Sequence, residues 1–280
     1  ALVMFTNGPT EPSAILQGEV PRLIVEWQEV PSLWDAVRYE VDIRHKQGQF
    51  ILTGSSTPKR KGIMHSGAGR IAPLRMRTMS LWESGDSDGK VSLQSLFSGK
   101  LETQLTGDVS LRRLSQLIVR GGWPQGLTVP EEQSYLLPQG YINAIIDDGA
   151  NRLDDIKRDS SKMIRLLRSL ARNESTTASN NKIMSDIVEF DNETMSKATY
   201  NKYIGVIDRM FLTDNTLPFS TNVRSSLRIK QQEKRHLSDP SLSASLLGLT
   251  AKKLLSDLNT MGFLFESLVE HDLEIYADAI

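Results

Sequence analysis

The sequence predicts an α/β protein in which a partial parallel sheet is followed by a mostly helical region. Two observations carry this prediction. Residues 21–53 have the pattern of a strand, a helix and a second strand joined by short links, which is the order of a right-handed parallel crossover. Residues 163–211 have apolar positions three and four apart, which is the period of helices with one buried face.

The composition is that of a soluble globular protein and excludes several classes of function. The chain has 280 residues and a net charge of −1, so no overall field directs it to nucleic acid or membrane. It has no cysteine, which excludes disulfides and thiolate metal sites. No apolar run approaches the roughly 20 residues of a membrane span. We therefore expect a cytoplasmic protein without a membrane partner.

The first element of the crossover is a buried strand that ends at an acidic residue. Leu23–Val25 is an unbroken apolar run followed by Glu26, and such a run is typical of strands buried on both faces. Residues 33–41 place their apolar side chains on one helical face. A second buried strand follows at residues 50–52 and ends in Thr53–Ser55.

The carboxyl ends of these two strands form the edge at which parallel sheets bind ligands. Hydrolysis of a phosphoanhydride needs a carboxylate to orient water, a metal ion to neutralise phosphate charge, and a polar group near the terminal phosphate. Glu26 has the place of the carboxylate, and Thr53 or Ser55 that of the polar group. Val25 stands where a metal-holding aspartate is expected. From spacing alone, Glu26 as a solvated carboxylate is the simpler interpretation.

Three motifs in sequence order carry a resemblance to a known family. They lie at residues 23–31, 48–58 and 65–71. Together they closely resemble prokaryotic AAA-type ATPases of the P-loop fold that carry a C-terminal domain of unknown function, DUF4143. In that family the first motif is the Walker B strand, which ends in Asp-Glu-x-Gln, and the second is the sensor 1 strand, Leu-Thr-Gly-Ser. The resemblance covers essentially the whole chain and implies ATP and Mg²⁺ as cofactors of the full-length family.

The resemblance also implies roles for individual residues. Glu26 orients the attacking water, Thr53 and Ser55 contact the nucleotide, and Arg70 acts on nucleotide as an arginine finger that reaches a neighbouring subunit of a homo-oligomer. The alternative for Arg70 is a turn residue that pairs with a local carboxylate. The chain departs from the family because it has no Walker A loop and has Val25 in place of the Walker B aspartate. We therefore expect a fragment of a longer chain that binds neither ATP nor Mg²⁺.

The segment after the third motif is less informative. Residues 72–81 alternate apolar and polar positions and predict a half-exposed strand. Arg120 precedes a Gly-Gly-Trp-Pro turn that matches a family signature, with core packing of Trp123 as the simpler interpretation and Arg120 as a phosphate sensor as the alternative. Residues 132–157 predict a helix interrupted at Pro138 and Gly140.

Three amphipathic helices followed by a hairpin predict a winged helix, with Ser196 as the N-cap of the third helix. Residues 212–219 have the pattern of the hairpin, and a recognition helix would present Lys197, Asn201 and Lys202 to DNA. A structural or protein-contact role is the alternative. The apolar positions of the three helices are Met163, Ile164, Leu166, Leu167, Leu170 and Ala171; Ile183, Met184, Ile187 and Val188; and Tyr200, Tyr203, Ile204, Ile207, Met210 and Phe211.

The last part of the chain resembles the start of the DUF4143 domain. It carries Lys-Arg-x-x-x-Asp at residues 234–239 and Gly-x-x-Phe-Glu-x-x-Val at residues 262–269. The resemblance implies a restriction-endonuclease-like α/β domain with Glu266 on its first helix. One carboxylate cannot build a magnesium nuclease site. We therefore predict no metal site here and a hydrogen-bonding role for Glu266.

The predicted organisation has four parts: the C-terminal part of an AAA ATPase core (1–85), a helical segment (86–157), a winged helix (158–222) and the beginning of an endonuclease-like domain (223–280). The predicted function is that of an ATP-binding protein or ATPase of the AAA superfamily, inactive in this chain. The alternative is a non-enzymatic DNA-binding or protein-interaction module that uses the winged helix.

Overall fold

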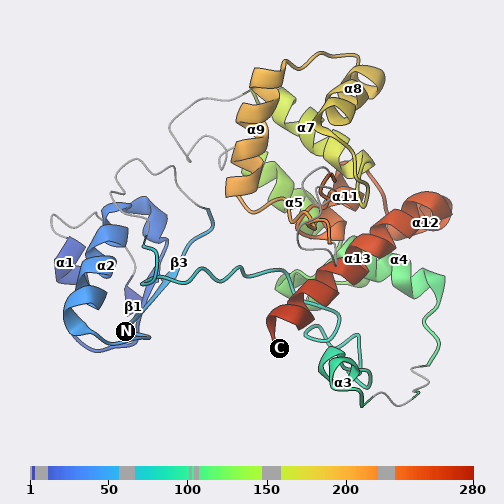
Figure 1. The fold of residues 1–280 in the computed structure, drawn as a ribbon. Helices are drawn as coiled ribbons and strands as arrows, with labels where there is room; N and C mark the ends of the chain where they lie inside the picture. The colour runs from blue at the N-terminus through green and yellow to red at the C-terminus, as the bar shows by residue number, and fades with distance from the viewer. Residues whose placement is uncertain are drawn as a thin grey trace. The chain divides into compact units, whose positions relative to one another are not determined.

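The computed structural model describes most of the chain, and the chain falls into two compact units (Figure 1). Unit 1 comprises Ala1–Met76, Asn151–Ile156 and Arg209–Phe211, and unit 2 comprises Arg77–Ala150, Lys157–Asp208 and Leu212–Ile280. The predicted division of residues 86–280 into three parts stays a prediction, and apart from Arg209–Phe211 the described residues of all three parts belong to unit 2. The described residues are 2–3, 12–56, 67–100, 103, 107–146, 159–219 and 231–280.

Unit 1 is built on a parallel sheet with the strand order β1-β2-β3. The strands are β1 (Leu2–Val3), β2 (Arg22–Val25) and β3 (Phe50–Thr53), with helix α1 (Pro12–Ile15) before β2. A 3-10 helix, η1 (Trp27–Glu29), and helix α2 (Ser32–Arg44) connect β2 to β3. The predicted strand–helix–strand unit is confirmed.

The core of unit 1 lies between the central strand and α2. Ile24 of β2 is fully buried and packs in one cluster with Leu16 and with Leu33 and Val37 of α2. The second strand is less buried than predicted, because Ile51 of β3 is 53% exposed. β3 is at the edge of the described sheet, so it lacks a neighbouring strand on one side, whereas β2 has one on both.

The predicted strand over residues 72–81 is wrong. Residues 71–77 have no regular secondary structure, and Leu74 and Met76 are 87% and 90% exposed. A strand needs a neighbour for its backbone groups, and no described strand pairs with this segment. Further along, the Met79 N–H donates to the carbonyl oxygen of Gly122, at 2.8 Å, and a turn follows.

Unit 2 is helical. Its core joins α4, α12 and α13 through Ile118, Leu254, Leu264 and Leu268. No helix within the described ranges combines the length and apolar character that crossing a bilayer requires. The helices are α3 (Leu93–Phe97), α4 (Leu111–Arg120), α5 (Leu136–Ala144), α7 (Ser160–Arg172), α8 (Asn180–Asp191), α9 (Lys197–Arg209), α11 (Pro240–Leu246), α12 (Ala251–Leu255) and α13 (Leu258–Asp278), with 3-10 helices η2 (Pro124–Leu127) and η3 (Glu131–Gln133).

Side-chain caps fix where several of these helices begin. Ser196 accepts a hydrogen bond from the Thr199 N–H at 3.2 Å before α9, which confirms the predicted N-cap. Ser179 does the same for α8, where its Oγ accepts from Lys182 N–H.

The predicted interruption at Pro138 and Gly140 is wrong, because α5 runs through both residues. Pro138 lies in the first turn of α5, where a missing N–H leaves no helical bond unmade.

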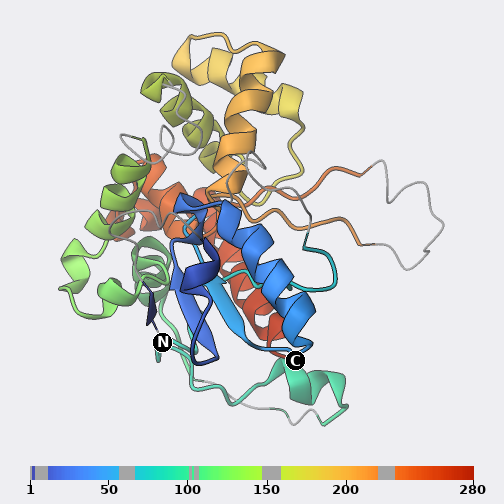
Figure 2. The same cartoon turned by 90° about the vertical axis from the view of Figure 1, so that its left-hand side faces the viewer.

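Two antiparallel segments follow α7, α8 and α9. Thr213 lies opposite Leu237 and Thr216 lies opposite Lys234, and Thr176, between α7 and α8, lies opposite Arg235. Figure 2 shows the two segments running alongside each other. The sequence predicts a hairpin that lies wholly within residues 212–219. In the structure, residues 213–216 pair instead with residues 234–237. The predicted boundary after residue 222 therefore falls between two paired segments.

Candidate functional site

Three polar side chains meet at the carboxyl ends of β2 and β3. Gln28 Nε2 donates to Glu26 Oε2 at 2.5 Å and to Ser55 Oγ at 3.3 Å. Ser55 Oγ lies 3.3 Å from the same Glu26 oxygen and donates to it. The structure therefore brings together Glu26 and Ser55, as the parallel-sheet rule predicts, with Gln28 between them.

The backbone at this edge is shaped to hold the three side chains. Glu26 has left-handed backbone angles, φ 54° and ψ 43°, which turn the chain from β2 into η1. This conformation is uncommon for a residue other than glycine. Gly54 lies close to Gln28, since a Cβ at residue 54 would lie 2.2 Å from Gln28 Oε1 and would displace the end of that side chain. Glycine thus leaves room for the amide that bridges Glu26 and Ser55.

Thr53 and Arg70 lie outside this cluster. Thr53 is the last residue of β3 and lies opposite Val25 in the sheet register. Arg70 Nε donates to Asp42 Oδ1 of α2 at 2.8 Å, and its Nη1 donates to the carbonyl oxygen of Ala68 at 3.2 Å. The hydrogen bond from Arg70 lowers the pKa of Asp42. This contact is the one that the local-carboxylate alternative for Arg70 predicts, and the arginine-finger role stays a prediction.

The side chains at this edge do not fit Mg²⁺ bound to a nucleotide. Mg²⁺ needs oxygen ligands in near-octahedral geometry, and Val25 offers none at the position where the family has aspartate. The nearest carboxylate oxygen, Glu26 Oε2, already accepts from Gln28 and Ser55. Across the described ranges, no group of three His, Cys, Asp or Glu side chains is placed to hold a metal ion. No hydrolytic step through Mg²⁺ follows from these residues.

A second candidate site is one face of α9, which we name the α9 surface: Lys197, Ala198, Asn201, Lys202 and Gly205. Lys197, Ala198, Asn201 and Lys202 are exposed, and Gly205 is half-buried. Within the described part of the chain, the side chains of Lys197, Asn201 and Lys202 form no hydrogen bond or ion pair. The structure thus brings the three predicted nucleic-acid residues together on one helix face.

The elements around the α9 surface are joined through Asn180, the first residue of α8. Its Oδ1 accepts from the Tyr200 hydroxyl of α9 at 2.9 Å and from Arg235 Nη2 at 2.7 Å. Arg235 Nε also donates to the carbonyl oxygen of Ala178 at 3.1 Å. One amide therefore fixes α8, α9 and the antiparallel segments to one another.

Sequence reasoning missed a buried ionic network centred on Glu174. The side chains of Glu174 and His236 are only 2% and 5% exposed. Glu174 Oε1 accepts from His236 Nδ1 and Ser267 Oγ, both at 2.9 Å. Glu174 Oε2 accepts from Ser243 Oγ at 2.5 Å and from the Leu237 N–H at 3.2 Å. A polar turn after a helix gives no periodic signal of burial, so the pattern could not reveal this residue.

The network continues through His236 to α13. His236 Nε2 lies 2.9 Å from Glu270 Oε2, so the ring stands between two carboxylates. Burial lowers the pKa of His236, but the hydrogen bond from Glu174 and the charges of Glu174 and Glu270 together raise it above its usual value. Burial likewise raises the pKa of Glu270, and Lys234, His236 and Thr216 outweigh that effect and lower it. His236 is therefore a buried ring between two carboxylates, which favour its protonated form.

Glu266 has the simple role that the sequence favours. Its side chain is 48% exposed and pairs with Lys234, which also pairs with Glu270. Burial lowers the pKa of Lys234, and its bonds with Glu266 and Glu270 outweigh this and raise it. Glu266 thus forms an ion pair with Lys234 within the protein.

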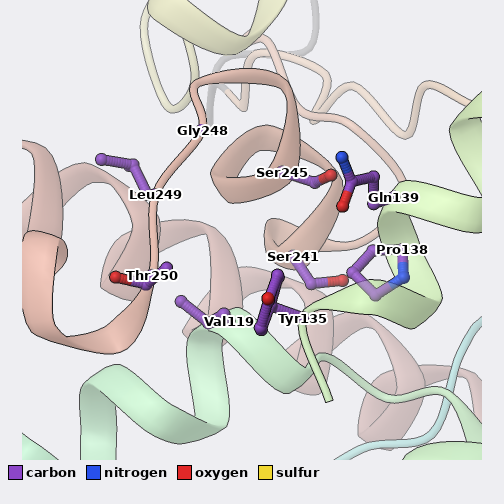
Figure 3. Close-up of a pocket in the computed structure, with 9 residues that line it drawn as sticks. All are labelled: Val119, Tyr135, Pro138, Gln139, Ser241, Ser245, Gly248, Leu249 and Thr250. Carbon is purple, nitrogen blue, oxygen red and sulfur yellow. The ribbon is translucent and has the colours of Figure 1, made fainter. Parts of the chain in front are cut away.

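A small cavity of about 190 Å³ lies elsewhere in unit 2 (Figure 3). Two of its polar groups are engaged within the protein, since Ser241 Oγ donates to Asp239 and Thr250 caps α12. None of the predicted site residues lines it. The lining residues come from α4, α5, α11 and the turn after α11: Val119, Tyr135, Pro138, Gln139, Ser241, Ser245, Gly248, Leu249 and Thr250.

Two family comparisons match the chain. Residues 12–84 match an AAA domain, and residues 111–253 match a domain of unknown function, DUF8612. The predicted DUF4143 assignment is therefore wrong. It relied on three motifs within residues 23–71, which lie in the matched AAA domain, and on two short motifs after residue 233, whereas the second matched domain begins at residue 111. No curated protein and no solved structure matches the chain.

Proposed function

Since the chain belongs to the DUF8612 family and its residues 12–84 form an AAA-type ATPase region, we propose that it is a member of the ATP-binding AAA superfamily in which the sheet edge at β2 and β3 neither binds Mg²⁺ with ATP nor hydrolyses ATP. The observation that supports the proposal most directly is the set of side chains at the carboxyl ends of β2 and β3. Glu26, Gln28 and Ser55 are the polar set that orients water in such enzymes, and Val25 replaces the carboxylate that holds the metal ion. The printed sequence also contains no Gly-x-x-x-x-Gly-Lys-Ser/Thr motif.

In this proposal Glu26 retains the position of the water-orienting carboxylate, with Ser55 as the sensor group. Gln28 is a positioning residue, because its amide holds both side chains together. Thr53 and Arg70 have the remaining nucleotide-contact positions. The pairing of Arg70 with Asp42 means that reaching a nucleotide of a second copy requires this exposed ion pair to open.

The experiment is single-turnover release of phosphate from ATP in the presence of Mg²⁺. The proposal expects a rate equal to that of a Glu26→Gln variant, because the metal-holding group is missing in both. A rate above that of Glu26→Gln would overturn it.

We propose as a second candidate function a non-enzymatic winged-helix module that binds DNA or protein. The order of elements in unit 2 supports this proposal: helix α7, the bridged residue Thr176, helices α8 and α9, and then the antiparallel pair. Binding of fluorescent duplex DNA and of candidate protein partners, each measured against salt, tests it. Absence of both kinds of binding in the presence of an intact fold would contradict the module.

A further inference from the structure

We propose that the α9 surface binds in the major groove of duplex DNA, with Asn201 directed at the base edges and Lys197 and Lys202 at the phosphates. This inference rests on the winged-helix arrangement of the second candidate function and goes beyond it, because it selects one class of partner and assigns a role to each side chain.

The shape of the surface fits a groove. Lys197 and Asn201 are four residues apart, and so are Ala198 and Lys202, so all four lie on one side of the helix. Ala198 and Gly205 are small, which lets the helix backbone approach a partner closely. A helix of 13 residues is about 20 Å long, and the major groove, about 12 Å wide, admits a helix.

The charges of the surface favour a polyanion. Lys197 and Lys202 contribute two positive charges, and the stretch 197–207 contains no acidic residue. The one carboxylate of α9, Asp208, accepts a hydrogen bond from Thr213 Oγ1 at 2.5 Å and is thus held toward the antiparallel segments. Because the whole chain has a net charge of −1, attraction to phosphate must come from such a local surface.

The same surface is poorly suited to a protein partner. Protein interfaces derive most of their binding energy from large apolar or aromatic anchors in desolvated centres. No large exposed hydrophobic residue belongs to α9, whose aromatic and branched residues Tyr200, Tyr203, Val206 and Ile207 are buried on the opposite face. Asparagine, by contrast, pairs bidentately with adenine N6 and N7.

The surface is held in place before any partner arrives. The Tyr200 hydroxyl donates to Asn180 Oδ1, and the Tyr203 hydroxyl accepts from the Asp159 N–H at 3.0 Å. Ser196 caps the first turn, which carries Lys197. A rigid helix loses little conformational entropy on binding, which favours recognition.

The test uses the 280-residue chain and a pool of duplex DNA with a randomised centre. Wild type is expected to enrich a site with one essential adenine, and Asn201→Ala is expected to lose about 5- to 150-fold of the preference for that base. Lys197→Ala/Lys202→Ala is expected to bind all sequences more weakly, with a slope of log K against log salt that is smaller by about 1.8, for two phosphate contacts. The matched control is Lys46→Ala/Lys252→Ala, which removes two exposed lysines from other elements.

Three results would overturn the inference. They also distinguish its failure from a failure of the proposed winged-helix module. If duplex binds but Asn201→Ala keeps the base preference, the face does not read bases, although the module remains a DNA binder. If the two lysine pairs reduce the salt slope equally, the α9 surface is not the phosphate contact. If no duplex binds at low salt while a protein partner does, the module is a protein-interaction domain.

Discussion

Replacing Glu174 by glutamine is expected to destabilise unit 2 strongly. The carboxylate accepts four hydrogen bonds, from His236, Ser267, Ser243 and the Leu237 N–H. Glutamine has nearly the same shape, but it removes the negative charge beside the buried His236 ring. It also places an amide NH₂ against groups that already donate.

The expected magnitude follows from burial. Removing one partner of a buried ion pair costs about 3–5 kcal/mol, because the other charge remains desolvated. The side chains of Glu174 and His236 are 2% and 5% exposed, so solvent cannot replace the lost partner. Relative to the roughly 5–15 kcal/mol of a typical domain, this loss is a large fraction of the stability of unit 2.

The assay must report on unit 2 alone, because the chain has two compact units. Hydrogen exchange of peptides covering residues 231–246 and α13 gives the free energy of opening for the segments that the network joins. The matched control is Glu132→Gln, an exposed carboxylate for which a change within about 0.5 kcal/mol is expected. A loss below about 1 kcal/mol for Glu174→Gln would show that the network is not a main support of the unit.

Three further predictions test other contacts. The free energy of unfolding of a His236→Gln variant should approach that of wild type as the pH rises. The folded pKa of His236 lies above the unfolded value of about 6.5, so the stabilisation by His236 is complete below pH 6.5 and is lost as the pH passes through the folded pKa. A stability difference that does not change between pH 5 and 10 would contradict this. Gly54→Ala should destabilise unit 1 by about 0.5–1.5 kcal/mol, the net value of a hydrogen bond, because the new Cβ displaces the end of the Gln28 side chain from its partners. Unchanged hydrogen exchange in β2 and β3 would contradict it. Asn180→Ala should cost about 1–3 kcal/mol by leaving Tyr200 and Arg235 without their acceptor; full protection of α8 and α9 in exchange experiments would refute this.

Local periodicity was sufficient to predict much of the fold. The apolar run Leu23–Val25 predicted a strand, because a strand buried on both faces has consecutive apolar residues. The spacing of apolar residues at 33–41 predicted a helix, because a helix buried on one side has apolar residues three and four apart. Together they predicted the parallel strand–helix–strand unit. The rule that parallel strands end at one edge also placed Glu26 beside Ser55. The predicted N-cap at Ser196 followed from a preference that acts within one turn.

The features that sequence reasoning missed depend on contacts between distant residues. Thr213 pairs with Leu237 across a long intervening segment. Because a short hairpin turn is what a sequence pattern can reveal, this pairing could not be predicted. Glu174 and His236 stand in polar stretches, where pattern alone predicts exposure rather than burial. The partner of Arg70 was named only as a local carboxylate, because Asp42 lies on α2, 28 residues earlier in the chain, and only the fold brings it close.

The most direct test of the central proposal is equilibrium binding of fluorescently labelled ATP to the 280-residue chain, with Mg²⁺ and with EDTA. The replacement of the metal-holding carboxylate by Val25 predicts no magnesium-dependent binding at micromolar ATP, and the same weak signal for wild type and for Glu26→Gln. Micromolar affinity that requires Mg²⁺ and is reduced in Glu26→Gln would contradict the proposal that this edge of the sheet is inactive.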